Sequence, residues 1–584
     1  MSVYPLWQAE VPEESTEEIQ RKREELEAEV DACCEVRGPY RNKVKKFLEI
    51  QEIWHISEID YQVRVKFEEF LKTEVKPVSF RMYRSGFDQI KRHSIQEQIQ
   101  TLKGKREALA ELNNQVIFLP YYPEQEIADQ FIRFTNVNNL VWDFKQKAPP
   151  ILKKQIFDVL QYMLRQHIEV KQRSEILGAL KKIYEFCVLE QVEDIEYLEQ
   201  KQIDRFRESI PYKREQELGM RVLNQCRRII FIQADKINWN ANIWYLERFF
   251  FEKSRVNPTN EVKTISFVQV ADKENRKYLQ QYMKYCLGVT HLSISVLRTE
   301  YTFIRNLAIW LEKERTQNIC YITNEVIEQY FRSLEHSNIK EEMFNRIVTS
   351  IAHFYDYLKV RGIIEKVPFC EQYYLKKEVL KHHDRSVQYD IYMEILDKLQ
   401  FFPENLRLMF LHLWGIGLRV SEVCSLKGDA YYIQGRDAWI QVYQIKMQNY
   451  KRIPIPWMLY KLMEVYRKKH GIASDDYIFQ NKKGGAYHIS TFRSNMLKYC
   501  KENKIANGEY LFKSHDYRHT VATMYYENGV SLQSIRDYLG HDYEEMTRRY
   551  IDYMPNKISK ANEEFFEREE SSLSFGIKRC KREK

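Results

Sequence analysis

The chain has 584 residues, of which 44% are hydrophobic and 30% are charged, and its 91 Lys and Arg exceed its 83 Asp and Glu by a net charge of +8. This length predicts three or four domains, and the composition excludes a disordered protein, while no apolar run approaches the roughly 20 residues of a membrane helix. The mildly basic charge permits nucleic-acid binding without arguing for it.

The cysteine pattern indicates the compartment. Ten cysteines are scattered along the chain, and only Cys33 and Cys34 lie close together. No CxxC pair, metal-ligand spacing or secretory signal occurs in the sequence. We therefore expect a protein of a reducing, cytoplasmic compartment without disulfides or structural zinc.

The first 370 residues are predicted to be mainly helical. Glycine (18) and proline (15) are scarce in the chain, and amphipathic patterns dominate this part. Residues 13–30 are strongly charged with few apolar positions, which predicts a surface helix or a short coiled segment.

An apolar pattern recurs within this helical part. One copy comprises Leu307, Trp310, Ile322, Ile327 and Tyr330. A shift of 124 residues towards the N-terminus gives Ile183, Phe186, Leu198, Ile203 and Phe206. A looser copy comprises Val44, Phe47, Ile59, Arg64 and Phe67, where the arginine breaks the apolar rule. The pattern predicts related helical modules in series, and the alternative is chance, because apolar helix stripes resemble one another.

The pattern of apolar and polar residues changes after about residue 376. Residues 438–455 partly alternate apolar and polar side chains around a polar turn, which predicts a β-hairpin. Helices are expected at 404–413, 456–469 and 490–502, with several short ones from residue 516. The last third is therefore predicted to be α+β, mostly helical with a small antiparallel sheet.

Several polar residues of this last third could handle a phosphate. Arg419 follows a glycine turn at the start of a helix, where its guanidinium lies beside backbone N–H groups. The alternative for Arg419 is a surface or cap pair with Glu422. His515 and Arg518 are three residues apart on one helix face, so they could grip an anionic oxygen and move a proton.

Two further residues complete the set. His541 follows Gly540, and Tyr550 comes nine residues after that histidine. Taken singly, each of these residues could be a helix cap, a satisfied polar group or a packing aromatic. The chain has 40 tyrosines, so the residue type alone indicates nothing.

The joint pattern resembles the tyrosine recombinase, or phage-integrase-like, family. The matching motifs, in order, are Gly417-Leu418-Arg419 with Ser421 and Glu422, then His515, Arg518 and His519, then Leu539-Gly540-His541 and Tyr550. Lys446, eight residues before Pro454, resembles the lysine that the family carries on its hairpin. Met447 stands where the family commonly has glycine, so Lys451 remains an alternative to Lys446.

The resemblance implies a role for each residue. Tyr550 would attack a DNA phosphodiester, with His515 accepting or managing its proton. Arg419 and Arg518 would bind the non-bridging oxygens, and His541 would add one further bond. Lys446 would protonate the leaving 5′-oxygen. Neither a metal nor a nucleotide cofactor is implied.

The resemblance also implies a domain organisation. The fold class expected is mainly α, with a small antiparallel β-sheet in an α+β C-terminal catalytic domain. Helical N-terminal modules and a helical core-binding domain precede it. The predicted segments are an extension at 1–125, a module repeating the core-binding domain at 126–265, a core-binding domain at 266–375, a catalytic domain at 376–560 and a tail at 561–584.

The function implied is site-specific DNA recombination, of the integrase or transposase type, through a 3′-phosphotyrosyl intermediate. Expected partners are duplex DNA with specific sites, a homo-tetramer on paired sites, and accessory proteins, in the bacterial cytoplasm or nucleoid. The alternatives are a type IB topoisomerase and an inactive DNA-binding accessory protein. The N-terminal modules would bind additional DNA or partner subunits.

The C-terminal segment carries two predictions of its own. A helix at 557–570, with Leu573 and Phe575 after it, is expected to dock into a neighbouring subunit. The basic residues between 578 and 584 form either a solvated tail or a nucleic-acid patch.

Overall fold

The computed structural model describes residues 16–110, 112–132, 137–166, 169–314, 318–378, 385–548 and 562–565. The chain forms two compact units, one comprising 1–248 with 266–271 and the other 249–265 with 272–584. The described part is mainly helical with small antiparallel sheets, which confirms the predicted fold class. The five segments predicted from the sequence remain a prediction.

The described helices include none that is both long enough and apolar enough to cross a membrane.

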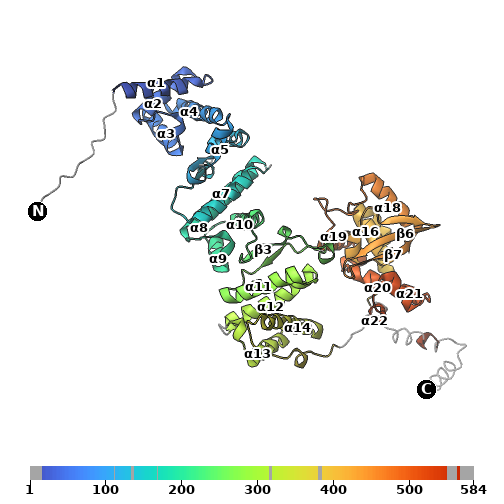
Figure 1. Cartoon of the computed structure of the whole chain (residues 1–584). Helices are drawn as coiled ribbons and strands as arrows, with labels where there is room; N and C mark the ends of the chain where they lie inside the picture. Colours follow the sequence, from blue (N-terminus) through green and yellow to red (C-terminus); the bar gives the residue numbers. More distant parts are fainter. Residues whose placement is uncertain are drawn as a thin grey trace. The chain divides into compact units, whose positions relative to one another are not determined.

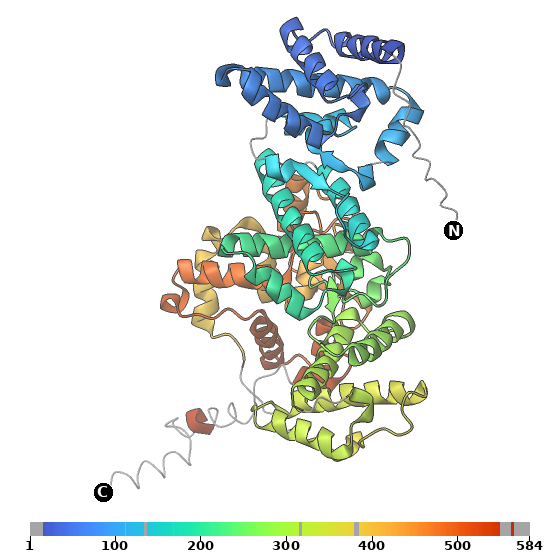
Figure 2. The same ribbon diagram turned by 90° about the vertical axis from the view of Figure 1, so that its left-hand side faces the viewer.

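Three four-helix modules make up most of the helical part, and each module forms one group of helices in the two views (Figure 1, Figure 2). Module 1 comprises α1 (Thr16–Ala32), α2 (Gly38–Ile50), α3 (Tyr61–Glu74) and α4 (Pro77–Gln98). Module 2 comprises α7 (Pro150–Leu164), α8 (Val170–Leu189), α9 (Gln200–Glu208) and α10 (Lys213–Gln233). Module 3, in the second unit, comprises α11 (Lys273–Val289), α12 (Ile294–Glu314), α13 (Asn324–Glu335) and α14 (Glu341–Val360).

A short 3₁₀ helix joins the second and third helices of every module. These are η1 (Ile56–Glu58), η6 (Ile195–Tyr197) and η9 (Ile319–Tyr321). Each begins with an isoleucine whose carbonyl is bonded by the fifteenth residue of the module's fourth helix. The bonds are Lys91 Nζ to Ile56 O at 2.8 Å, Arg227 Nε to Ile195 O at 3.3 Å and Tyr355 Oη to Ile319 O at 2.9 Å.

The backbone N–H of the same isoleucine is also bonded in each module. Its acceptor is a side chain of the first helix: Glu29 Oε2 at 2.9 Å, Gln155 Oε1 at 3.0 Å and Asn275 Oδ1 at 2.8 Å. Buried backbone groups need such partners, because leaving one unsatisfied costs about 1–3 kcal/mol. The three modules thus share one internal brace, which ties the first and fourth helices through the central turn.

Arg64, which interrupts the apolar pattern in module 1, is buried but satisfied. Its guanidinium donates to Asp88 Oδ1 at 2.7 Å and to Glu68 Oε1 at 2.8 Å, and it lies over the ring of Phe118 at 4.8 Å. A buried charge is tolerated when it is paired in this way. Arg64 therefore occupies a core position without leaving its charge uncompensated.

Smaller elements follow modules 1 and 2. They are α5 (Leu102–Ala110), β1 (Val116–Phe118), α6 (Gln125–Ala128), β2 (Val141–Asp143), β3 (Ile243–Tyr245) and β4 (Thr264–Ser266). Strands β1 and β2 pair antiparallel, with Ile117 opposite Trp142.

The C-terminal part of the second unit surrounds a three-stranded antiparallel sheet in the order β5-β6-β7. The strands are β5 (Tyr431–Gln434), β6 (Asp437–Gln444) and β7 (Asn449–Ile455). The predicted hairpin is therefore present as β6 and β7, with Ile440 opposite Ile453. Every second residue of β6, from Ala438 to Gln444, is buried, as expected for a strand with one face on a core.

Helices cover this sheet and complete the domain. They are α15 (Tyr389–Lys398), α16 (Glu404–Ile416), α17 (Val420–Cys424), α18 (Trp457–His470), α19 (Ile489–Glu502), α20 (Ser514–Glu527), α21 (Leu532–Leu539) and α22 (Glu544–Arg548). The shared core includes Phe410 of α16, Ile440 of β6 and Tyr517 of α20. The helices α16 and α20 pack against each other, which brings the end of one beside the start of the other.

Candidate active site

A left-handed glycine ends α16 and positions Arg419. Gly417 has φ +63°, and an added Cβ would lie 3.2 Å from the side chain of Val521. A side chain there would be both strained and crowded, so the turn requires glycine. Two residues later, Arg419 is the N-cap of α17.

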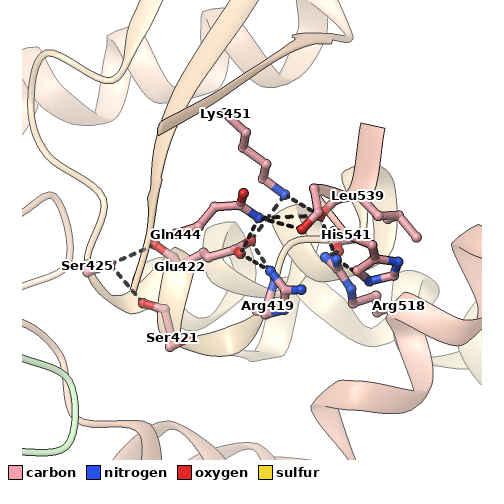
Figure 3. A network of polar contacts seen from close by, with 11 residues as sticks. Arg419, Ser421, Glu422, Ser425, Gln444, Lys451, Arg518, Leu539 and His541 are labelled. Carbon is pink, nitrogen blue, oxygen red and sulfur yellow. Dashed lines mark hydrogen bonds and ion pairs between the residues drawn. The ribbon is translucent and has the colours of Figure 1, made fainter. Parts of the chain in front are cut away.

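Glu422 is the centre of a buried polar network (Figure 3). Its carboxylate accepts from Arg419 Nη1 at 2.8 Å and lies 3.2 Å from Lys451 Nζ. Gln444 Nε2 donates to the same carboxylate at 3.3 Å. Burial alone would raise the pKa of Glu422, but Lys451, Arg518 and Arg419 lower it to about 2. Glu422 is therefore ionised at neutral pH.

Arg518 and His541 form the second half of the network. Arg518 is buried and donates to Gly417 O at 2.8 Å and to Leu539 O at 2.6 Å. Its Nη2 also lies 2.9 Å from His541 Nε2, so this ring nitrogen must be the acceptor. The proton of His541 then sits on Nδ1, which donates to Thr547 Oγ1 at 2.9 Å.

Burial and the nearby Arg518, Arg419 and Lys451 lower the pKa of His541 to about 2, which keeps the ring neutral. Both ring nitrogens are thus engaged within the protein. His541 could donate to a phosphate only after its contact with Arg518 or Thr547 opens.

Leu539 O links the two halves, because it accepts from Arg518, from Lys451 Nζ at 3.3 Å and from Gln444 Nε2 at 3.5 Å. The next residue, Gly540, has φ +69°, and an added Cβ would lie 2.3 Å from Gln444 Nε2. The Leu539-Gly540-His541 motif therefore needs its glycine for a left-handed turn against a buried amide.

His515 lies on the second residue of α20, with its ring 5.3 Å from that of His519. Its side chain is exposed, yet partial loss of hydration together with His519 and Arg518 lowers its pKa to about 4. The imidazole is consequently neutral at pH 7 and able to accept a proton.

The two candidate lysines lie in different environments. Lys446 is exposed in the turn between β6 and β7. Lys451 is buried on β7 beside Glu422, and burial lowers its pKa to about 8 although Glu422 opposes the change. Burial and the attraction of Glu422 shift the pKa of Lys451 in opposite directions, and burial has the larger effect.

Arg419 contributes a buried donor that the rest of the described network does not use. Arg419 Nη2 is buried and makes no hydrogen bond to any residue that the structure describes. Three cations, Arg419, Lys451 and Arg518, surround the single carboxylate of Glu422. The cations thus outnumber the carboxylate, and a buried N–H donor is unused. An anion such as phosphate would balance this charge and accept that hydrogen bond.

The structure therefore brings Arg419, Arg518 and His541 together, while Lys446 stays in its turn. The predicted nucleophile Tyr550 and the neighbouring Tyr553 lie outside the described residues, and of the predicted docking segment only 562–565 is described. Sequence reasoning missed Gln444 and Thr547. Gln444 could have been noticed, since it is the one polar residue among the inward-facing residues of β6.

Residues 385–557 match the model of the phage integrase family. The match includes every candidate site residue, from Arg419 to Tyr550.

Transposase B from transposon Tn554 of Staphylococcus aureus (strain Mu50) is 25% identical over 345 residues, which cover 56% of this chain and 54% of the transposase. The chain thus matches about half the length of this relative. Tyrosine recombinase XerC of Oceanobacillus iheyensis is 23% identical, covering 47% of this chain and 92% of XerC. The solved Tn1549 transposon integrase in complex with transposon right end DNA covers 49% of this chain and 98% of its own, at 16% identity and a TM-score of 0.37.

Proposed function

We propose that this protein is a site-specific DNA recombinase that cuts and rejoins duplex DNA through a 3′-phosphotyrosyl intermediate. The observation that carries the proposal is the buried Arg419 Nη2 without an acceptor, inside a cluster of three cations and one carboxylate. A DNA phosphodiester would supply that acceptor. The family match over 385–557 supports the assignment of this phosphate to strand exchange.

Arg419 and Arg518 are proposed to stabilise the transition state. As Tyr550 attacks, negative charge grows on the two non-bridging oxygens, and guanidinium groups fixed by Glu422 and by Gly417 O need no reorganisation to meet it. Losing one such preorganised donor should cost roughly 3 kcal/mol, which is on the order of 100-fold in rate.

The protons are proposed to move between side chains and the two DNA oxygens. The hydroxyl proton of Tyr550 passes to His515, whose low pKa keeps it neutral and ready to accept. The phosphotyrosyl bond forms as the bond to the 5′-oxygen breaks, and that oxygen leaves with a proton from a lysine. A new 5′-hydroxyl then attacks the phosphotyrosine and gives its proton to the lysine. The phosphodiester forms as the bond to Tyr550 breaks, and the Tyr550 oxygen recovers its proton from His515.

The proton donor is proposed to be Lys446, with Lys451 as the alternative. Lys451 Nζ is already engaged by Glu422 and Leu539 O in a buried position, which suits a role in holding the carboxylate of Glu422 in place. Lys446 is exposed and can follow its hairpin turn towards a bound duplex. His541 is proposed to orient Arg518 and to bind the phosphate if its ring is released.

The wider assembly is part of the same proposal. A core-binding domain at 266–375 and a catalytic domain at 376–560 would grip a specific duplex site, and four copies would pair two sites in the bacterial cytoplasm or nucleoid. Accessory proteins are included in this proposal, and strand exchange by the purified protein alone would show that they are not required. The relative named as a transposase supports a mobile-element role.

Covalent trapping tests the proposal. The wild-type chain and Tyr550→Phe are incubated with nicked duplexes from the DNA flanking the coding sequence, with Tyr553→Phe as the matched control. A protease-sensitive band in a denaturing gel, absent only with Tyr550→Phe, is the expected result. A band that survives Tyr550→Phe would refute the assignment of the nucleophile. Relaxation of a supercoiled plasmid without recombination sites would favour a topoisomerase, and absence of any adduct would favour a non-catalytic DNA-binding protein.

A further inference from the structure

The buried hydroxyl of Thr547 contacts the ring of His541. Thr547 lies on α22, is fully buried, and precedes Tyr550 by three residues in the sequence. Its Oγ1 lies 2.9 Å from His541 Nδ1. Among the residues that the structure describes, the His541 ring is the one hydrogen-bond partner of this hydroxyl. The contact therefore joins the last helix before the predicted nucleophile to the phosphate-binding network.

The backbone of His541 is held independently of its ring. Its N–H donates to Arg536 O at 3.0 Å, directly after the left-handed turn at Gly540. The ring is buried, with Arg518 on its Nε2 side and Thr547 on its Nδ1 side (Figure 3 shows the contact with Arg518). Because backbone and ring are both held, each nitrogen keeps its neighbour. The ring can respond to a ligand by carrying its proton on the other nitrogen.

The two neighbours of the ring differ in what they can do. A guanidinium only donates, so Nε2 accepts from Arg518, and the single proton of the neutral ring lies on Nδ1. A hydroxyl can both donate and accept. Thr547 Oγ1 can therefore accept from Nδ1–H, as it does in this structure, and it can equally donate to an Nδ1 without a proton.

A phosphate bound by Arg518 would reverse the requirement at Nε2. The ring nitrogen that faces Arg518 also faces an anion held by that guanidinium, and the lone pair of a bare Nε2 repels a phosphate oxygen. A proton on Nε2 would instead be donated to that oxygen. A neutral ring has one N–H, so Nδ1 then lacks its proton and needs a donor, because a buried unsatisfied nitrogen is costly. The hydroxyl of Thr547 is positioned to be that donor.

We propose that Thr547 is a positioning residue that lets His541 change tautomer when a phosphate enters the site. In the free protein, Nδ1–H donates to Thr547 Oγ1. In the phosphate-bound protein, Thr547 Oγ1–H donates to Nδ1 and Nε2–H donates to a phosphate oxygen. One proton passes from Nδ1 to water and one passes from water to Nε2, so the ring stays neutral. The inference rests on the proposed function for the identification of this phosphate as one of DNA.

Nuclear magnetic resonance of the full-length chain labelled with ¹⁵N-histidine measures the tautomer. The signals of His541 are those that disappear in His541→Gln. We expect Nδ1–H in sodium chloride and Nε2–H in inorganic phosphate at equal ionic strength, for wild type and for Thr547→Ser. Thr547→Val keeps the shape of the side chain without its hydroxyl, and should show one tautomer in both solutions. Nε2–H in the chloride solution, no change in phosphate, or a change that persists in Thr547→Val would overturn the proposal.

Covalent trapping on the nicked duplexes measures the consequence for strand cleavage. Thr547→Val should slow trapping at saturating duplex about ten-fold, the equivalent of one hydrogen bond, while the duplex concentration for half-maximal rate changes by less than about two-fold. Thr547→Ser should stay close to wild type. In a His541→Gln background Thr547→Val should cost nothing further, because the hydroxyl acts through the ring.

Thr523→Val is the matched control. It removes another buried threonine hydroxyl of the same domain, one that accepts from Ser386 Oγ at 3.2 Å, and trapping should stay close to wild type. Thermal unfolding followed by circular dichroism checks that every variant is folded. If Thr547→Val unfolds, the two wild-type spectra and the Thr547→Ser variant still decide the proposal.

Two kinetic outcomes would overturn the inference. One is an equal loss of trapping in Thr547→Ser and Thr547→Val, and the other is a Thr547→Val loss that persists in full in the His541→Gln background. Failure of the proposed function gives a different result, namely no adduct with any nicked duplex in wild type. The spectra in chloride and phosphate need no DNA, so they test the tautomer change separately from strand cleavage.

Discussion

Glu422→Gln is the substitution that tests the buried network most directly. It keeps the shape of the side chain but removes the one negative charge facing Arg419, Lys451 and Arg518. The pKa of Glu422 falls from 4.5 to about 2 in the folded protein, which corresponds to roughly 3 kcal/mol of stability at neutral pH. Removing one partner of a buried pair costs a similar amount, about 3–5 kcal/mol.

Hydrogen exchange followed by mass spectrometry measures this loss locally in the full-length chain. Peptides from α17 and the β6–β7 hairpin should exchange on the order of 100-fold faster in Glu422→Gln, because each 1.4 kcal/mol corresponds to a factor of ten. Glu502→Gln is the control, since Glu502 is half-exposed and its ion pair within the described part of the chain is a 3.8 Å contact with Lys498.

The dependence on pH has a defined sign. A carboxyl whose folded pKa is lowered contributes stability that is complete above its unfolded pKa and is lost as pH falls through the folded value. The difference between wild type and Glu422→Gln should therefore be constant above about pH 5 and shrink between pH 4.5 and 2. Exchange that stays within a few-fold of wild type at pH 7 would refute the reasoning.

Four other changes have defined outcomes. In a trapping assay, Lys446→Ala should reduce strand cleavage by roughly 100-fold. A 5′-bridging phosphorothioate, whose leaving group needs no protonation, should restore cleavage by Lys446→Ala. The same substrate should not restore cleavage by Lys451→Ala. In a pH–rate profile, the rate of covalent trapping by wild type should fall as pH drops through about 4, because His515 becomes protonated there. Gly540→Ala should destabilise its domain by about 1–3 kcal/mol in urea unfolding, because of the left-handed turn and the crowded Cβ. Tyr355→Phe should destabilise module 3 by about 1–3 kcal/mol in the same measurement, since it leaves a buried carbonyl unsatisfied.

Each of these predictions has a matched comparison. Phosphorothioate rescue of Lys451→Ala instead of Lys446→Ala would exchange the roles of the two lysines. A pH profile unchanged in His515→Gln would exclude His515 as the proton acceptor. Gly529→Ala is the control for Gly540→Ala, because Gly529 has φ +79° with open space around it. Tyr373→Phe, at an exposed tyrosine, is the control for Tyr355→Phe.

Much of the C-terminal domain could be predicted from local patterns. The helices expected at 404–413, 456–469 and 490–502 are α16, α18 and α19, because apolar periodicity and flanking proline or glycine define them locally. The strand β5 was missed, since four residues before a glycine turn leave too short a pattern. The α17 start was suggested by the glycine turn before Arg419.

The site was predictable in its residue types and less so in its contacts. The order and spacing of the motifs pointed to Arg419 and Arg518, and these do lie in one network. Their internal partners depend on tertiary packing, which sequence spacing does not contain: the cap pair of Arg419 with Glu422, given as the alternative, is present, but Glu422 is buried and also pairs with Lys451. Likewise, nothing local distinguishes Lys451, which packs inward on β7, from Lys446 in the turn.

The brace of the helical modules has a consequence for how the chain is made. In each module the group that bonds the central isoleucine carbonyl lies far along the chain, at separations of 35, 32 and 36 residues. A nascent chain emerging from the ribosome therefore cannot close a module until most of its fourth helix has been synthesised. Truncations that end within α4, α10 or α14 before the fifteenth residue should leave that module open to proteases, whereas those that end between modules should not.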